Sequence, residues 1–437
     1  MTTTSSPDTD LAFARGVAAQ ACAAGADAAH AALMRDERIE VGFDTRRLSL
    51  LRTTESETTG LGVFKAGRKG NATITGSRPE AVAVAIQEAL AAAEAGPADP
   101  ANVIADAASQ PPSTHGPASG DRDVMIERAL EHIEGMRREY PAIVSRESYH
   151  RFVRSRRSFA NSGGVAQQET RGRYAFWTMF AGRREGRSTS LNYSGASAYT
   201  PFKRLIDVGA LRRLYGEASR SFDMQPAPGK FIGDVIVAPD AFEGFLLWPL
   251  ARVLGGYTLL SGTSPYKEKR GARVASPLFG LLNRPTAASF PEGQDFDGYG
   301  VPTRDLDVIR DGVLQDFLVD FYIAKKLGLA QTAGASAFVV PPGTKTEAEI
   351  IAETNRGILL TRFSGGSPAD NLDFSGIAKN AFYVEDGKIR HPLAETMISG
   401  NLCALLLAIR AVSTETVDFG NGRFPTIAAG GVTIHGR

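Results

Sequence analysis

Residues 38–44 read RIEVGFD, and apolar and polar side chains alternate along them. Ile39, Val41 and Phe43 share one face of an extended chain, and the residues between them share the other. This period of two predicts a β-strand with one buried and one solvent-facing side. Because such strands typically belong to antiparallel sheets, the segment predicts an antiparallel sheet in the N-terminal half.

The segments around this strand predict a small unit of strands and helices. The Ala-rich stretch Leu11–Met34 predicts a helix, with Gly25 as a break or end. A second helix is predicted over Pro79–Ala95, with Ser77 as its N-cap and Glu80 completing a capping box. Further strands are predicted at Arg46–Thr53, Gly60–Phe64 and Asn71–Thr75. Residues 1–100 therefore predict one α+β unit.

The next region begins with the segment best suited to be a linker. Gly96–Asp121 holds five prolines, so we expect irregular structure there. A helix is predicted over Asp121–Glu139, followed by several strands within Ala142–Tyr193 that turn at Asn161-Ser162-Gly163-Gly164. A helix is expected at Asp207–Ser221. We assign 121–228 to the N-terminal domain as its middle region.

Arginine is concentrated in the strands of this middle region. Arg151–Arg187 contains nine arginines and two acids, a local charge of +7. One interpretation is the solvated face of a sheet, and another is a groove for an acidic or backbone-rich ligand. Nucleic acid is the least favoured ligand, because the whole chain is nearly neutral.

The C-terminal half, residues 231–437, has short apolar runs set between glycines, which is typical of a β-rich domain. Two helices are predicted there, at Asp240–Leu254 and Leu402–Val412. The fold class predicted for the whole chain is α+β. It comprises an N-terminal region of antiparallel strands with helices and a β-rich, barrel-like C-terminal domain.

Composition excludes several classes of protein. The 437 residues include 49 Lys and Arg against 48 Asp and Glu, which argues against a protein that coats nucleic acid or an anionic membrane. The two cysteines, Cys22 and Cys403, cannot form a CxxC motif. The N-terminus lacks the pattern of a signal peptide, and no stretch is apolar enough for a membrane span. A cytoplasmic location is expected.

The motifs of common active sites are missing from the sequence. The two histidines closest in sequence, His115 and His132, are 17 residues apart, so no HExxH or HExxxH helix exists. There is no phosphate-binding P-loop. Asp295-Phe296-Asp297-Gly298 resembles the start of a calcium loop, but Leu306 stands where the loop requires Glu. We interpret it as a turn before a strand at Pro302–Ile309.

The C-terminal half nevertheless carries short motifs in a characteristic order and spacing. They are SGTS at 261–264, YKEKRG at 266–271, FDGYGVPTR at 296–304, DGVL at 311–314, FSGG at 363–366, DFSG at 373–376, VEDGKI at 384–389 and TMISGNL at 396–402. This ordered set resembles the TldD/PmbA family. The N-terminal unit, with GLGV at 60–63, is similar to the first domain of that family, so the resemblance covers nearly the whole chain.

The resemblance implies a cytoplasmic peptidase, or a subunit of one, with a β-rich C-terminal domain that encloses the site. The zinc-bearing branch has an HExxxH helix just before the Gly-Thr-Ser segment and a Cys near the C-terminus. Here the helix motif falls on Leu247–Arg252, and Val417–Gly422 contains no Cys. The chain therefore resembles the PmbA (TldE) branch, which lacks the metal site. The resemblance implies no metal ligand, no catalytic residue and no cofactor in this chain, with zinc in a TldD-like partner subunit.

One departure from the family pattern suggests a specialised role. Tyr299 stands where the family usually has an acidic residue. This favours a dedicated copy that acts on one peptide or natural-product precursor.

The resemblance implies a heterodimer in which this chain forms a wall of the chamber and holds an extended peptide by strand addition. The candidate substrate-binding residues are Arg304, Ser364, Gly365, Gly366 and Asn401. Two alternatives stay open. The chain could be a non-enzymatic stabilising or regulatory subunit, or a homodimer with an uncharted metal-free activity.

Overall fold

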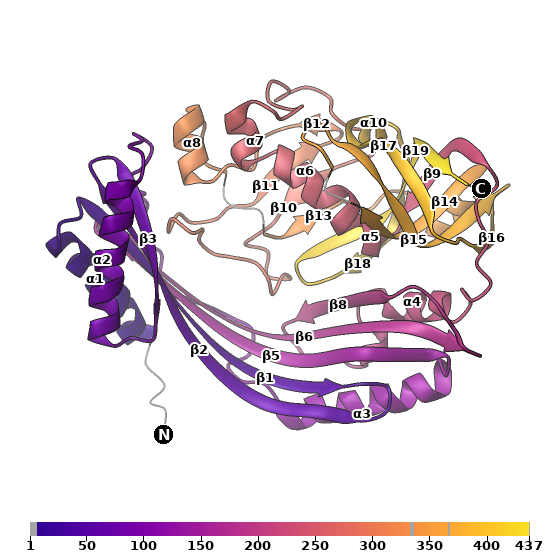
Figure 1. Ribbon diagram of the computed structural model, residues 1–437, viewed down its shortest axis with the longest axis horizontal. Helices are drawn as coiled ribbons and strands as arrows, with labels where there is room; N and C mark the ends of the chain where they lie inside the picture. Colours follow the sequence, from indigo (N-terminus) through magenta and orange to yellow (C-terminus); the bar gives the residue numbers. More distant parts are fainter. Residues whose placement is uncertain (1–6, 333–335, 366–367, 437) are drawn as a thin grey trace.

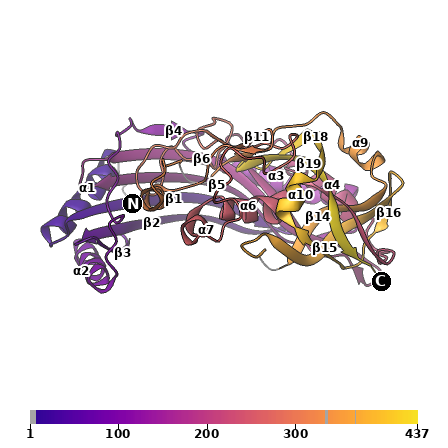
Figure 2. The same cartoon turned by 90° about the horizontal axis from the view of Figure 1, so that it is seen from above.

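The computed structural model describes residues 7–332, 336–365 and 368–436, and they form two β-sheets that share no strand. A long curved sheet is built from the N-terminal half, and the C-terminal half lies against one face of it (Figure 1). Seen from above, the strands of the first sheet extend beyond the C-terminal region at one end, where the first two helices lie (Figure 2).

The N-terminal sheet is antiparallel except at one short strand, because its long strands follow one another as hairpins. Its main order is β3-β2-β1-β5-β6, and β4, β7 and β8 pair with β6. The strands are β1 (Ala28–Phe43), β2 (Leu48–Lys65), β3 (Arg68–Thr75), β4 (Ser113–His115), β5 (Ile143–Asn161), β6 (Ala166–Arg184), β7 (Arg187–Ser188) and β8 (Asn192–Ala198). Only β4 pairs in parallel with β6. The predicted turn at residues 161–164 joins β5 to β6 and is confirmed.

Helices cover the face of this sheet that is turned away from the C-terminal half, and the last of them lies at the sheet edge beside that half. Two pack over one end of the sheet, α1 (Pro7–Ala23) and α2 (Pro79–Ala95), and two over the other, α3 (Arg122–Glu139) and α4 (Leu211–Ala218). Ala-rich contacts fill the first core, where Gly70 of β3 lies so close to α2 that a Cβ would meet the Ala89 carbonyl at 1.9 Å. Aromatic rings fill the second core. The opposite face of the sheet is left for the C-terminal half.

The C-terminal half is built around a closed five-stranded barrel. Its strands are β9 (Lys230–Val237), β14 (Arg356–Gly365), β15 (Asp373–Glu385), β17 (Thr396–Asn401) and β19 (Gly422–His435). The β19–β9 pairing closes the ring, and β9–β14 is its one parallel pair. The α+β class and the barrel-like C-terminal domain are thereby confirmed.

Smaller elements surround the barrel. The additional strands are β10 (Leu281–Asn283), β11 (Leu306–Arg310), β12 (Val313–Leu314), β13 (Phe338–Val339), β16 (Lys388–Pro392) and β18 (Ile409–Asp418). The helices are α5 (Pro239–Phe242), α6 (Trp248–Val253), α7 (Gly256–Ser261), α8 (Phe321–Leu327), α9 (Glu347–Ala352) and α10 (Leu402–Leu407). The strand predicted at Pro302–Ile309 begins later, at Leu306.

Two predictions for the first hundred residues were wrong in part. The predicted helix Leu11–Met34 ends at Ala23, and Ala28 already begins β1. Alanine is compatible with a helix and with a strand, and here the hydrogen bonding to β2 and β5 stabilises the strand. The helix Pro79–Ala95 is confirmed, but its N-cap is Arg78, which makes no side-chain cap hydrogen bond, so the capping box at Ser77 is wrong.

Two further helices are shorter than predicted, and a third is interrupted. The segment Asp207–Ser221 is helical over Leu211–Ala218, after a short 3-10 turn. In Leu402–Val412 the helix ends at Leu407 and β18 follows, because pairing with β19 satisfies its backbone. A five-residue π-turn, Glu243–Leu247, interrupts the helix predicted at 240–254.

Much of the charge of the arginine-rich strands is matched by acids within the protein. Four of the nine arginines pair with a buried acid, and two more pair with acids that are partly exposed. The ion pairs are Arg151–Glu40, Arg154–Glu37, Arg156–Asp10, Arg157–Glu169, Arg171–Glu169, Arg171–Asp295 and Arg173–Glu292. The last two join the sheet to the C-terminal half, so this charge serves the architecture.

The Pro-rich segment 96–121 crosses an edge of the sheet. It supplies β4 and is tied down by side chains of β5 and β6, since Asn161 donates to the Ala105 carbonyl at 2.8 Å. The predicted units 1–100 and 121–228 both contribute strands to one sheet; the domain limits themselves, including 231–437, stay a prediction. Among the described residues, no helix has the length and apolar character needed to span a bilayer.

Candidate functional site

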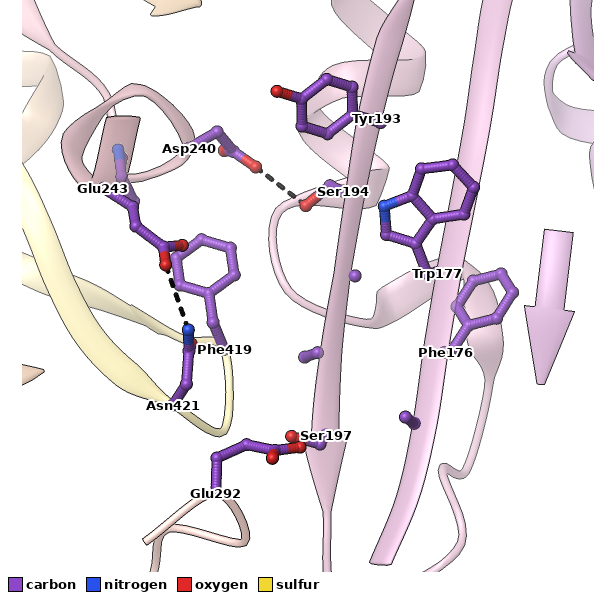
Figure 3. A pocket seen from close by; sticks show the side chains of 14 residues that line it. Phe176, Trp177, Tyr193, Ser194, Ser197, Asp240, Glu243, Glu292, Phe419 and Asn421 are labelled. Carbon is purple, nitrogen blue, oxygen red and sulfur yellow. Dashed lines mark hydrogen bonds between the residues drawn. The ribbon is translucent and has the colours of Figure 1, made fainter. Parts of the chain in front are cut away.

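A pocket of about 440 Å³ lies where the C-terminal half meets the edge of the N-terminal sheet (Figure 3). Its walls come from segments far apart in the sequence: β6 and β8, the start of α5 with the π-turn, the loop at Glu292, and the turn between β18 and β19. The volume lies in the usual range for small-molecule sites, about 300–1,000 Å³.

The π-turn places Glu243 at the pocket. A π-helix stacks residues five apart, and such turns are frequent at functional sites. Trp248, five residues on, donates its indole N–H to Glu243 Oε1 at 3.1 Å. The side-chain amide of Asn421 donates to the same oxygen at 3.2 Å, as drawn in Figure 3. One carboxylate oxygen is therefore held by two neutral donors.

A second carboxylate, Asp240, closes the pocket next to β8. It accepts from Ser194 Oγ at 2.9 Å and from Arg213 at 2.7 Å. Arg213 also binds Glu217, so two buried acids share one partly buried cation. Burial raises the pKa of Asp240 above its usual value and raises the pKa of Glu217 to about 7, because an ionised carboxylate loses hydration there.

Aromatic rings form the wall on the sheet side. Trp177 of β6 and Tyr193 of β8 lie with ring centroids 6.4 Å apart, and Phe419 faces them from the β18–β19 turn. Arg362 lies over the Tyr193 ring at 3.7 Å and donates to the Leu191 carbonyl. The pocket thus combines ring faces with carboxylates, an arrangement that suits a cationic group.

Three of the predicted site residues lie together, at a different place. Ser364 and Gly365 end β14, and Asn401 ends β17; β15 pairs with both strands at this end of the barrel. Asn401 caps α10 and also donates to Asp373 at 2.8 Å. Gly366 lies outside the described residues.

Arg304 is separate from this group in its bonding. Its guanidinium donates to the Gln331 carbonyl at 3.0 Å, in the loops before β11 and after α8. The structure therefore brings Ser364, Gly365 and Asn401 to one barrel end, and gives Arg304 different neighbours. Whether any of them binds substrate stays a prediction.

The residues at the positions of the zinc-binding motif do not fit a metal. Leu247 is packed in the barrel core, and Trp248 donates to Glu243. Arg252 forms an ion pair with Asp370 and donates to the Pro368 carbonyl at 2.7 Å. A hydrocarbon, an indole and a guanidinium offer no metal ligand. Within the described ranges, no three His, Cys, Asp or Glu side chains cluster to hold an ion.

Sequence reasoning did not find the pocket residues. The one available signal was Glu243, an acid within an otherwise uncharged and mostly apolar segment between Ala241 and Ala251. Trp177 and Tyr193 carried no such signal, because aromatics in strands usually belong to a core. Their approach to Asn421 depends on the packing of the two sheets, which no local pattern encodes.

Comparison with known proteins places the chain among peptidase relatives. Residues 228–436 match the PmbA/TldA metallopeptidase C-terminal domain. The metalloprotease PmbA homolog of Haemophilus influenzae is 24% identical over 90% of this chain and 88% of its own length. Metalloprotease PmbA of Escherichia coli O157:H7 is 26% identical over 78% of each chain.

The whole fold also has a solved counterpart. The crystal structure of TldE from Thermococcus kodakarensis superposes with a TM-score of 0.83 at 22% identity, over 98% of this chain and 99% of that one. That likeness extends to the N-terminal sheet, which the match at residues 228–436 leaves out. Taken with the ordered motifs of the barrel half, these findings show that residues 228–436 form a C-terminal domain of the TldD/PmbA family, and that the whole chain shares the fold of the solved TldE structure.

Proposed function

We propose that this chain is the PmbA (TldE)-like subunit of a heterodimeric zinc metallopeptidase, paired with a TldD-like subunit that holds the zinc. The observation that carries the proposal is the state of the three motif positions. Leu247, Trp248 and Arg252 each have a structural partner, and none is a metal ligand. The metalloprotease names of the relatives support peptide hydrolysis as the reaction of the complex.

In this proposal the partner's zinc activates water, and this chain shapes the chamber. An extended peptide is held main chain to main chain, and Ser364, Gly365 and Asn401 contribute through the barrel end that they share. Arg304 is a further residue that binds the substrate. The dedicated substrate is one peptide or natural-product precursor, as the tyrosine at position 299 suggested.

Co-expression with a TldD-like protein from the same source tests the proposal. We expect the two chains to purify together, with zinc and peptidase activity present only in the complex. Stoichiometric zinc on this chain alone would refute the assignment. A stable homodimer that ignores the TldD-like protein would favour a metal-free activity instead.

Alanine variants separate a substrate-binding subunit from a scaffold. Ser364→Ala and Arg304→Ala are expected to raise KM of the complex while the heterodimer stays intact by gel filtration. An unchanged KM in an intact heterodimer would favour the stabilising, non-enzymatic role. A generic unfolded peptide cleaved as well as any dedicated precursor would remove the specialised substrate.

A further inference from the structure

We propose that the pocket in Figure 3 binds a cationic group of the peptide substrate, either the side chain of a lysine or arginine or the N-terminal ammonium. The inference rests on the proposed function for the statement that the ligand is a peptide. The preference for positive charge rests on the pocket alone. It assigns the subunit without a metal motif a direct part in substrate selection.

The charge of the lining is the first argument. Asp240, Glu243 and Glu292 line the pocket, and its described lining includes no Lys, Arg or His. A neighbouring pocket on the sheet differs, because arginines and carboxylates line it in equal number; they are Asp36, Arg157, Glu169, Arg171, Arg173 and Glu292. The first pocket is therefore acidic, and the second is internally balanced.

The bonding of the three carboxylates is the second argument. Asp240 is bound by Arg213, and Glu292 by Arg173, so these two acids already have cations behind them. Glu243 has only the neutral donors Trp248 and Asn421, both on Oε1. No cation lies within ion-pair distance of Glu243 in the described part of the chain. Its second oxygen is left for a positively charged ligand.

The aromatic wall is the third argument. Trp177 presents an indole to the same space, and the face of an indole attracts cations more strongly than any other side-chain ring. The chain already uses this contact next to the pocket, where the Arg362 guanidinium lies over Tyr193 at 3.7 Å. Arg362 covers the Tyr193 ring and does not line the pocket, so Trp177 is the ring we assign to the ligand.

The position of the pocket connects it to the peptide. Trp248 belongs to the segment where the zinc branch has its helix motif, and Asn421 to the segment where it has its cysteine. Both reach Glu243. The pocket therefore lies beside the two segments that correspond to the zinc-binding motif, and there we expect a basic residue of an extended peptide to enter.

Intrinsic fluorescence provides the test, because the chain has two tryptophans and both contact this site, Trp177 in the wall and Trp248 on Glu243. The full chain is titrated with acetylated, amidated pentapeptides whose central residue is lysine, arginine or norleucine. A fourth peptide, with norleucine and a free N-terminus, isolates the ammonium. We expect the cationic peptides to bind about tenfold more tightly than acetylated norleucine.

Glu243→Gln is the diagnostic variant. Glutamine keeps an oxygen for Trp248 and Asn421 and removes only the charge, so the fold is preserved while the preference for cations falls to within about twofold. Glu80→Gln, an exposed acid on α2 at the far end of the sheet, is the matched control and keeps the preference. If the N-terminally acetylated lysine or arginine peptide binds best, the pocket takes a cationic side chain. If the norleucine peptide with a free N-terminus binds best, the pocket takes the N-terminal ammonium.

Equal binding of the norleucine and cationic peptides would overturn the inference, as would a preference that survives in Glu243→Gln. These outcomes are independent of the heterodimer. If the chain forms an active zinc peptidase but binds all four peptides equally, the cation site is refuted and the proposed function stands. If the chain prefers cationic peptides but does not pair with a TldD-like protein, the cation site stands and the proposed function is refuted.

Discussion

Acidic side chains have opposite roles in two neighbouring regions of the molecule. On the N-terminal sheet, Glu169 is buried and binds Arg157, Arg171 and the Asp295 amide. In the pocket at the sheet edge, Glu243 is held by neutral donors only. A carboxylate whose charge is matched inside the protein supports the fold, and one whose charge is unmatched is available to a ligand. A high local density of charge therefore does not by itself indicate a binding site.

The largest effect is expected from Glu169→Ala. It leaves Arg157 without its acid and the nearly buried Arg171 with Asp295 alone, and removing one partner of a buried ion pair typically costs about 3–5 kcal/mol. The free energy of unfolding in urea measures this loss. Glu185→Ala, at an exposed turn, is the control. A loss of unfolding free energy below about 1 kcal/mol would mean that Glu169 contributes no more than an exposed ion pair. The contrast between Glu169 and Glu243 would then not hold.

The next effect depends on pH. The pKa of Glu217 is raised to about 7 by burial, so the folded state binds this proton more tightly than the unfolded state does. The resulting stability is present below the unfolded pKa near 4.5, and is lost as the pH rises to about 7. This difference between the folded and unfolded pKa of Glu217 corresponds to about 3 kcal/mol of unfolding free energy.

Comparison of wild type with Glu217→Gln isolates this contribution. Unfolding free energies at pH 5 and pH 7.5 are expected to show the variant gaining on wild type as the pH rises. His132 and His150, whose pKa values burial lowers to about 4, give the opposite slope in both proteins and cancel in the difference. A difference that does not change with pH would contradict the prediction.

A smaller effect is expected at Arg252, which holds the segment 368–370 to α6. The Arg252–Asp370 pair is partly exposed, so Arg252→Ala is expected to shift the urea midpoint by roughly a third or less of the shift at Glu169. Arg252→Lys keeps the charge but loses the planar guanidinium that binds the Pro368 and Ala369 carbonyls. Its urea midpoint should lie between those of wild type and Arg252→Ala. A shift as large as that at Glu169 would show that this position is as essential to the fold as the buried network.

The smallest effect is expected at Glu243. Glu243→Gln keeps both hydrogen bonds and breaks no ion pair, so its unfolding free energy should stay within about 0.5 kcal/mol of wild type. Calorimetry or urea unfolding measures this. A strong destabilisation would mean that the charge of Glu243 supports the fold, and would remove the contrast with Glu169.

Sequence patterns were reliable where the local signal and the packing agree. Val82, Ile86 and Leu90 repeat at helical spacing and are buried on α2, so that helix was predicted to the residue. The patterns failed where pairing overrides propensity. Ala28–Ala32 is as suited to a helix as Ala18–Ala21, and only the neighbouring strands make it extended.

The pocket could not be predicted, because its residues are brought together by tertiary packing and not by a local sequence pattern. Ser364, Gly365 and Asn401 were chosen from motifs, and they share one end of the barrel because β15 pairs with both of their strands. Trp177 and Asn421 meet only because the barrel docks on the sheet. The arginine-rich stretch could be seen in the sequence, but its partner acids lie on other elements, so its role could not.

The pairing that closes the barrel has a consequence for how the chain folds. β9 opens the C-terminal half, and its neighbour β19 lies near residue 435, where His435 pairs with Lys230. Contacts this distant in sequence form slowly, because a long loop must be ordered first. The N-terminal sheet can form during synthesis, whereas the barrel must wait for β19. Until then the apolar edge of β9 is a surface that a chaperone would protect.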